Sequence, residues 1–582
     1  MSELRAGDHE RDSHRTPCAR RGLALGIVAL LAVACAPGSP GEGFLGDGDR
    51  VELCQGEVEV PDDALREALL AVVSQPDPPE DLPEGEQPEP VILADRLRAV
   101  RGLNVPERGI ESLAGLECAQ GLLSLGLAGN AISDVTPLLD LTGLEQLELS
   151  GNQITDLSAL GRLTRLTRLS IDDNGVTSLD PLATLTNLEA LDAGSNELTD
   201  VSPLAGLLGL AVLVLSNNQI ADVSPLAGLT ELRGLEIDGN LVTDITPLSG
   251  LTRLRFVDLD GNEIDSLEPL ASAVDMQEIE ASRNQLTSLA GVERMVALTR
   301  ITAQENQITS TEGVGDLVLL STLDLGDNAI ASLTGVEGLG ELQTLRLALN
   351  AVTDLSPLTG LPELRTLDLR YNEGLSDLGV LGTLPLLGSL AAGGYEQTQD
   401  LSGLAGRQVL RSLTFIEGRV PDLAFFGDLP GIESINFEGT PLSGDDLANI
   451  ALAGTLQSLS LDATGISDLS PLEPLMLVEA IEARDNALLR VDTLARWINL
   501  RTARLSGNPL SSLEGVEMHE VLSELDVSNT PIDDLTPVVN NETFRRGDTL
   551  VITETGVDSG DCGDIATIAG REAVVETDLE CP

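Results

Sequence analysis

The chain has 582 residues with 94 acidic and 34 basic side chains, which gives a formal net charge of −60, and it contains no lysine, so all 34 are arginine. Such an acidic surface repels nucleic acid and anionic lipid head groups, and it favours solubility, salt tolerance or a cationic partner. Aromatic residues make up only 2% of the chain, which is few for a globular core but sufficient for a core of stacked leucines.

Residues 1–34 have the features of a bacterial export signal. Arg20 and Arg21 precede an uncharged apolar run over residues 23–34, which is too short to span a bilayer as a mature helix. The run ends in Leu-Ala-Val-Ala directly before Cys35, and this ending is similar to a lipobox. We therefore expect Cys35 to be the lipidated first residue of an exported protein, anchored in the bacterial envelope at the outer membrane. Ordinary secretion is the alternative.

Two segments separate this signal from the main body of the chain. Residues 35–50 are rich in Gly and Pro and should form a flexible tether. Residues 51–99 begin with a helical pattern that Pro61 opens, with Leu65 and Leu69 on one face, and continue into a loop rich in Pro and Glu. The helix start is well marked, because proline is favoured at the first helical position.

A 22-residue unit repeats over residues 100–378. It carries the pattern L-x-x-L-x-L-x-x-N, as at Leu144, Leu147, Leu149 and Asn152. The alternating leucines predict a short strand whose leucines point inward, and stacked units build a continuous core. The asparagine amide should satisfy the backbone that turns away from each strand and link neighbouring units. Twelve asparagines share this position: Asn130, Asn152, Asn174, Asn196, Asn218, Asn240, Asn262, Asn284, Asn306, Asn328, Asn350 and Asn372.

This pattern resembles the leucine-rich repeat family, specifically the 22-residue class of internalin-like bacterial proteins. The resemblance implies an α/β fold, a right-handed solenoid of about 20 coils. A parallel sheet would line its inside, with short 3-10 or irregular turns outside. The segment over residues 51–99 then looks like the helical cap that covers the first coil. In the outer turns we expect Ser224 to cap and Pro225 to occupy the first helical position.

The repeats diverge over residues 379–540. The next bend after Asn372 falls at Tyr395, 23 positions on, and later bends often carry Thr or Gly instead of Asn. These residues satisfy fewer backbone groups, so we expect the part between Tyr395 and Thr464 to be the least regular and most mobile. The shift has two alternative explanations: drift of the sequence, or an insertion that shapes a binding surface.

Four cysteines lie outside the export signal and the proposed anchor, in two pairs at opposite ends of the repeats. We predict that Cys54–Cys118 clamps the N-terminal cap and that Cys562–Cys581 closes a C-terminal cap over residues 541–582. Other pairings would have to bridge the whole array. The alternative is four free thiols in a reducing cytosol.

The sequence predicts no enzyme and no catalytic residue. His519 is the only histidine outside the export signal, so a zinc site with several His or Cys ligands is excluded, and without lysine there is no phosphate-binding loop of the usual kind. No cofactor is expected apart from calcium, which clustered acids on neighbouring strands could share. The calcium candidates are Asp258, Asp260, Glu278 and Glu280.

The resemblance implies that the concave face binds a protein. Interface anchors are often aromatic residues or arginine. A group with such residues falls on two adjacent coils directly before the register shift, and Phe256 belongs to a second group. The candidate binding residues are Arg346, Leu349, Asp368, Arg370, Tyr371 and Phe256.

We therefore predict a non-enzymatic, protein-binding lipoprotein of the bacterial cell envelope. Its partner would be a protein, which the acidic surface favours as basic. Membrane contact would come only through the lipid anchor, and nucleic acid is excluded as a partner. A structural or carbohydrate- or calcium-binding surface component is the alternative.

Overall fold

The computed structural model describes residues 54–73, 90–395 and 397–581. The predicted export signal, Cys35 and the tether lie outside these residues. Within them, all strands belong to one open parallel sheet in which each strand pairs with the next along the chain, as β1 does with β2 and β21 with β22. The predicted leucine-rich repeat solenoid is confirmed.

The sheet of the described residues has 22 strands, and most of them are three residues long. In chain order they are β1 (Gly102–Asn104), β2 (Ser124–Gly126), β3 (Gln146–Glu148), β4 (Arg168–Ser170), β5 (Ala190–Asp192), β6 (Val212–Val214), β7 (Gly234–Glu236), β8 (Phe256–Asp258), β9 (Glu278–Glu280), β10 (Arg300–Thr302), β11 (Thr322–Asp324), β12 (Thr344–Arg346), β13 (Thr366–Asp368), β14 (Ser389–Gly393), β15 (Ser412–Ile416), β16 (Ser434–Asn436), β17 (Ser458–Ser460), β18 (Ala480–Glu482), β19 (Thr502–Arg504), β20 (Glu524–Asp526), β21 (Thr549–Val551) and β22 (Val574–Glu576).

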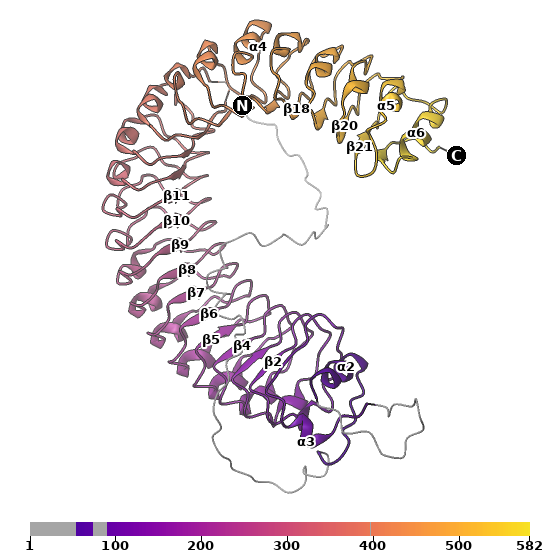
Figure 1. The fold of residues 1–582 in the computed structure, drawn as a ribbon. Coiled ribbons are helices and arrows are strands. Elements are labelled where there is room, and N and C mark those ends of the chain that lie inside the picture. Colours follow the sequence, from indigo (N-terminus) through magenta and orange to yellow (C-terminus); the bar gives the residue numbers. More distant parts are fainter. Residues whose placement is uncertain (1–53, 74–89, 396, 582) are drawn as a thin grey trace, which may run out of the picture.

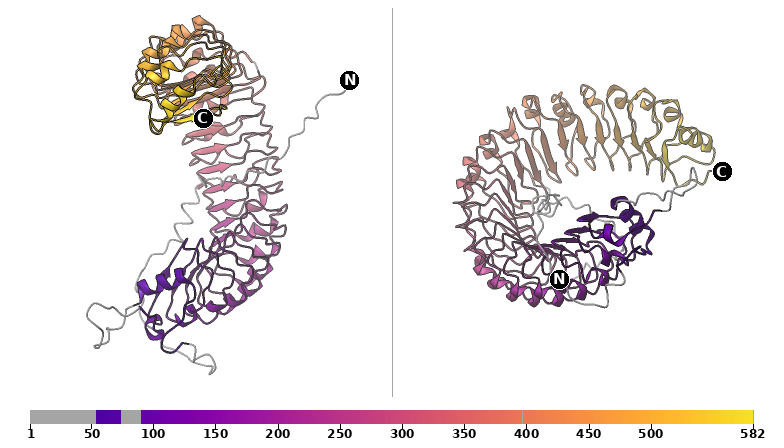
Figure 2. Two further views of the ribbon diagram at one scale, coloured as in Figure 1. Left: turned by 90° about the vertical axis from the view of Figure 1, so that its right-hand side faces the viewer. Right: turned by 60° about the horizontal axis from the view of Figure 1, so that its bottom comes forward.

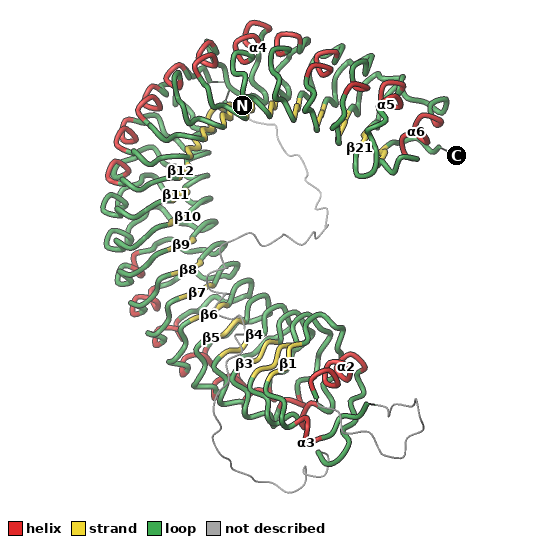
Figure 3. Tube along the Cα trace, viewed as in Figure 1, coloured by secondary structure: helices red, strands yellow, loops and turns green. Residues whose placement is uncertain are grey.

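The coils stack into an arc with the strands on its inner side and the helical turns on its outer side (Figures 1 and 3). The further views show that the arc does not lie in one plane but also rises along its length (Figure 2). Curvature follows from the two layers, because extended strands stack more closely than the bulkier turns opposite them. The sheet therefore forms a long concave face.

The core consists of the leucines that point inward from each coil. Leu147 pairs with Leu169 across neighbouring strands, 22 residues apart, and both are almost completely buried. Because every unit places its leucines at the same positions, each coil buries the apolar face of the next, and no single coil could do so alone.

The asparagine row links neighbouring coils through their backbones. Asn240 is 5% exposed, and its Nδ2 donates to the carbonyl oxygens of Leu215 and Ile237, both at 3.0 Å. Its Oδ1 accepts from the Ile220 backbone N–H at 3.0 Å. One side chain therefore satisfies backbone groups of two coils, as predicted, and the same pattern recurs at Asn218 and Asn262.

Most outer connections contain a 3-10 helix of three to five residues, such as η6 (Ser224–Gly228). The helix begins at Ser224, so Pro225 is its second residue and not its first as predicted, and the prediction that Ser224 caps was also wrong. Val223 stands at the N-cap position, and the side chain that bonds to the start of the helix is that of Asp222. Asp222 Oδ1 accepts from the Ser224 backbone N–H at 2.8 Å, and the Ser224 hydroxyl donates to the same carboxylate. An aspartate side chain can reach the backbone N–H two residues later, which is why Asp222 makes this bond. The Ser224 hydroxyl adds a second hydrogen bond to the same carboxylate.

The divergent repeats keep the sheet intact, but, as expected, they are less regular than the coils before them. β14 and β15 are five residues long and pair over all five positions. The extra residues are accommodated outside the sheet, where α4 (Gly444–Ile450) replaces a 3-10 turn. Thr440 substitutes for an asparagine by donating from Oγ1 to the Phe415 carbonyl oxygen at 3.0 Å.

A cap closes each end of the solenoid, and the structure contains both predicted disulfides, Cys54–Cys118 and Cys562–Cys581. The N-terminal cap holds α2 (Asp63–Val72) and α3 (Ala94–Leu97), and the C-terminal cap α5 (Thr536–Asn540) and α6 (Cys562–Ala569). Asp62 caps α2 through Oδ1, which accepts from the Leu65 N–H, while its Oδ2 accepts from the Glu111 N–H of the first coil. One carboxylate thus joins helix and solenoid, and these hydrogen bonds hold its pKa below the usual value although partial burial opposes them.

Candidate protein-binding face

The N-terminal half of the concave face carries a column of carboxylates. Position three of successive strands holds Asp192, then Val214, Glu236, Asp258 and Glu280, in direct register. Desolvation by burial and the neighbouring charge of Asp172 together raise the pKa of Asp192 to about 7. The column therefore holds like charges that the surrounding coils only partly neutralise.

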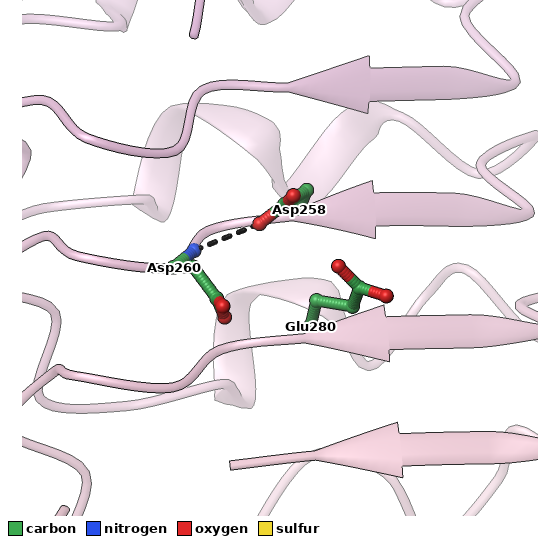
Figure 4. A group of neighbouring side chains, drawn as sticks. All are labelled: Asp258, Asp260 and Glu280. Atoms are coloured by element: carbon green, nitrogen blue, oxygen red, sulfur yellow. Dashed lines mark hydrogen bonds between the residues drawn. The ribbon is translucent and has the colours of Figure 1, made fainter. Parts of the chain in front are cut away.

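Three of the four calcium candidates come together. Asp258, Asp260 and Glu280 each place a carboxylate oxygen within 4.8 Å of the others, as Figure 4 shows. Glu278 does not join them, because its carboxylate faces Arg300 at 2.8 Å. The group is a set of hard oxygen ligands on two strands, and we assign no metal to it because no further feature of the site points to one.

Replacing Asp258 with asparagine should stabilise the protein in alkaline solution. Desolvation and the nearby Asp238 raise the pKa of Asp258 to about 9, so the folded chain retains a proton that the unfolded chain releases above pH 4. The free energy of unfolding of the native protein therefore falls as pH rises from about 4 to about 9. The Asp258→Asn variant does not lose this stability, because its amide does not titrate. At pH 8 we expect a gain of about 1–3 kcal/mol in the free energy of unfolding, measured by urea denaturation.

The gain should nearly vanish at pH 3.5, where the carboxyl is protonated in the folded state and mostly protonated in the unfolded state. Asparagine keeps the hydrogen bond that Asp258 Oδ1 accepts from the Asp260 N–H at 3.0 Å, so the change isolates the charge. Asp156→Asn is the control, because the hydrogen bonds of Ser158 lower the pKa of that exposed carboxyl. An equal gain in the control, or a gain that persists at pH 3.5, would contradict the assignment.

The predicted group before the register shift is close together, but all three of its charged members already have a partner of opposite charge. Arg346 lies between Asp324 and Asp368 on the sheet and contacts Asp324 at 3.2 Å. Asp368 is only 8% exposed, and Arg370 donates to both of its carboxylate oxygens, at 3.0 and 2.7 Å. The interpretation of Asp368 as an exposed anchor was therefore wrong: it orients Arg370.

Leu349 and Tyr371, the other members of this group, lie directly before the asparagine position, where each coil turns away from its strand. This position has a positive φ in every regular coil and usually carries glycine or a short polar residue, whereas Leu349 and Tyr371 have φ values of 57° and 55°. Tyr395 follows with 58° in the next coil. Bulky side chains in this region are uncommon and strained. Three successive coils therefore display large side chains where the backbone disfavours them.

Sequence reasoning had treated Tyr395 only as a bend. It is 55% exposed and contacts Tyr371 edge to face, with ring centroids 5.5 Å apart. The ring of Tyr371 lies so close to Gly394 that a Cβ there would fall 2.5 Å from it. The signal was available, because the chain has only two tyrosines and both lie next to the register shift. We call Leu349, Tyr371 and Tyr395 the aromatic rim.

Phe256 stands apart from this group. It is half-buried on β8, and the strands β9 to β11 separate it from Arg346 on β12. A further charged region, which the sequence did not reveal, lies near the C-terminal end. There Arg504 pairs with Glu524 at 2.7 and 3.0 Å and also contacts Glu482. In this region Arg484 and Arg504 partly neutralise the acids of neighbouring coils.

The one histidine of the described residues does not line any surface. His519 is 1% exposed and takes the place of a core leucine beside Trp497, the only tryptophan. Burial lowers its pKa, so the ring is held neutral. A group enclosed in this way cannot meet a substrate from solution.

Among the described residues, no helix has both the length and the apolar character needed to cross a membrane. The family model for "Leucine Rich repeats (2 copies)" matches residues 120–162, 164–206, 209–250, 230–272 and 341–383. None of the curated proteins matches the chain.

Several solved structures are similar. An internalin, InlF, from Listeria monocytogenes is 31% identical, covers 57% of this chain with 95% of its own, and gives a TM-score of 0.53. A leucine-rich repeat protein of Leptospira interrogans is 21% identical, with 76% of this chain and 97% of its own covered and a TM-score of 0.49. A plant peptide hormone receptor, RGFR1, in complex with RGF2, is 14% identical, with 84% and 96% covered and a TM-score of 0.50.

Proposed function

Because the chain belongs to the leucine-rich repeat family, we propose that it is a non-enzymatic lipoprotein of the bacterial cell envelope that binds a protein partner on its concave face. Solenoids of this kind serve as protein-binding scaffolds, since they present variable side chains on a rigid frame. The lipid anchor at Cys35 is part of this proposal, and the solenoid would be held at the outer membrane by the tether that follows it.

The aromatic rim is the observation that carries this proposal. Leu349 is 43% and Tyr395 55% exposed in a chain with few aromatic residues, and Tyr371 packs between neighbouring coils. Aromatic and large apolar side chains surrounded by polar groups are typical centres of binding energy. Arg346 and Arg370 border the rim, and their acidic partners fix their orientation.

The partner should bind in two ways. The rim would take apolar side chains, and the acidic surface of the chain, with its net charge of −60, would attract basic ones, which raises the association rate at low salt. The partner is therefore a protein with an apolar patch next to a basic one. The distribution of charge supports this, because the carboxylates of the N-terminal half have few arginines among them.

The test is a pull-down from envelope extracts with the full chain and with a variant carrying Leu349→Glu and Tyr371→Ala. We expect one protein to be retained by the native chain and lost from the variant, because the two changes place a charge and a cavity in the rim. Removing contacts of this kind weakens binding by about 2–4 kcal/mol, which corresponds to about 30- to 1,000-fold in affinity.

Leu208→Glu is the matched control, because Leu208 is an exposed leucine, at 58%, distant from the rim. It should leave retention unchanged. If all three baits retain the same basic material at moderate salt, the acidic surface acts without specificity. A structural coat would then be the better description of the protein.

A further inference from the structure

A groove runs along the N-terminal end of the sheet, between α2 and the first strand. It has a volume of about 470 Å³, within the range of about 300–1,000 Å³ that is common for ligand sites. One wall is formed by α2, with Ala64, Glu67, Ala68, Ala71 and Val72, and the other by residues 102–106. Figure 3 shows α2 beside β1 at this end of the arc.

The strand that forms this wall has a free edge. Within the described residues β1 pairs only with β2, through groups of alternate residues: the Arg101 carbonyl accepts from the Ser124 N–H, and the Val105 N–H donates to the Gly126 carbonyl. Backbone groups alternate between the two sides of a strand. Gly102 and Asn104 therefore direct their N–H and C=O groups away from β2, towards the groove.

The groove also ends at an unusual cation. Arg108 lines it and stands where the regular coils have their asparagine, with its backbone N–H bonded to Asn130 Oδ1. Its side chain is exposed, and none of the ion pairs found among the described residues includes it. In a chain with 94 acidic residues, an arginine without an acidic partner at the end of a groove is a ready site for an external carboxylate.

We propose that this groove binds the extended C-terminal segment of a partner protein, which adds a strand to the free edge of β1. The backbone of the segment would bond to Gly102 and Asn104, its small apolar side chains would lie on the alanines of α2, and its terminal carboxylate would meet Arg108. Addition of a strand between a sheet edge and a helix is an established mode of peptide recognition. This site is separate from the aromatic rim and does not depend on it.

The orientation follows from the sheet. All strands of the described residues are parallel, so a segment that continues the sheet would run in the same direction as β1, from Gly102 towards Asn104. Its C-terminal end would then lie beyond Asn104, on the side of Pro106 and Arg108. The alanines of α2 leave room for small or medium side chains only. A second copy of this chain is disfavoured as the occupant, because two chains of net charge −60 repel each other.

The experiment screens the full chain against a library of short synthetic peptides with free C-termini, and against the same peptides with amidated C-termini. We expect a subset of the free peptides to bind and their amidated forms to bind at least about tenfold more weakly. Arg108→Glu and Ala71→Trp, which reverses the charge and fills the groove, should each cause a loss of similar size. Bound peptide should also slow hydrogen exchange at the amides of Gly102 and Asn104.

Arg66→Glu is the control, because Arg66 lies on α2 but is exposed outside the groove and pairs with Asp63. It should bind like the native chain, and thermal unfolding of each variant should match the native curve. Absence of binding peptides, equal binding of amidated peptides, or equal binding by Ala71→Trp would overturn the proposal. A dimer that Ala71→Trp dissociates in the absence of peptide would overturn it in favour of a second copy.

Discussion

Replacing Asn240 with alanine should lower the free energy of unfolding by about 3 kcal/mol. The side chain is buried and bonds four backbone groups of two coils: it donates to the carbonyls of Leu215, Ile237 and Asp238, and it accepts from the N–H of Ile220. Alanine leaves the Ile220 N–H without its acceptor in a space that water does not reach. The carbonyls of Leu215, Ile237 and Asp238 each lose one donor but keep another, from Asn218, Asn262 and the Asn217 backbone, respectively. A buried group without a partner costs about 1–3 kcal/mol, and the carbonyls lose less because other donors remain near them.

The loss can be measured by urea denaturation followed by circular dichroism, with hydrogen exchange to locate it. Exchange should accelerate first in the coils that contain Ile220 and Asp238, since a solenoid transmits damage mainly to its nearest neighbours. Asn187→Ala is the matched control. Asn187 is exposed and donates a single hydrogen bond, to the Thr164 carbonyl at 2.8 Å, so its replacement should cost less than about 1 kcal/mol. Equal losses in both variants would show that the row has no special role.

The repeat explains why so much of the fold followed from the sequence. An asparagine every 22 residues fixes both the strand that precedes it and the turn that follows it, so Asn152 alone determines where Leu147 and Leu149 must point. Each coil repeats the same local pattern and packs only on its neighbours, so the pattern of one coil also determines the tertiary structure. In a globular domain the packing of distant elements would have remained open.

The sequence failed to predict the structure where a residue or segment could adopt either of two local structures that both fit the repeat pattern. The segment after Ser443 was not recognised as a helix, although Ser443 and Asp446 form a capping box at the start of α4; the repeat pattern favoured a 3-10 turn there. Asp368 was placed at an exposed strand position, but its burial depends on how far the side chain of Arg370 folds back over it. The burial of a side chain of this kind depends on the packing of its neighbours, which the spacing of the leucines does not determine.

The site was predictable to the same extent. The sequence placed Leu349 and Tyr371 on neighbouring coils before the register shift, and their role in binding stays a prediction. Of the four acids that it grouped from alternation along the strands, three lie together. Sequence could not show that Glu278 turns to Arg300 while Glu280 turns to Asp258, because both residues lie on the same strand and point to the same face. Nor could it show the groove beside β1, which arises from the position of α2 relative to the sheet.

Removing the disulfide Cys54–Cys118 by a double change to alanine should destabilise the protein more than removing Cys562–Cys581. The first bond joins residues 64 positions apart and the second joins residues 19 apart. The restriction of the unfolded chain grows with the length of the closed loop, and it amounts to about 4 kcal/mol for the first bond and about 3 kcal/mol for the second. Thermal unfolding of the two variants under oxidising conditions measures the difference.

The N-terminal bond should also matter for more than stability, because it holds the cap that forms one wall of the groove. The cap is tied to the first coil by Asp62, which accepts from the Glu111 N–H, and by the disulfide, while Arg98 donates to the Cys54 carbonyl at 2.8 Å within the cap. Without the disulfide, Leu65 and Leu69 would be exposed whenever the cap opens. Proteolysis should therefore cleave the N-terminal variant in the cap before the repeats unfold, whereas the C-terminal variant should keep its N-terminal cap. Cleavage at both ends at the same rate in both variants would mean that the caps do not open independently of the solenoid.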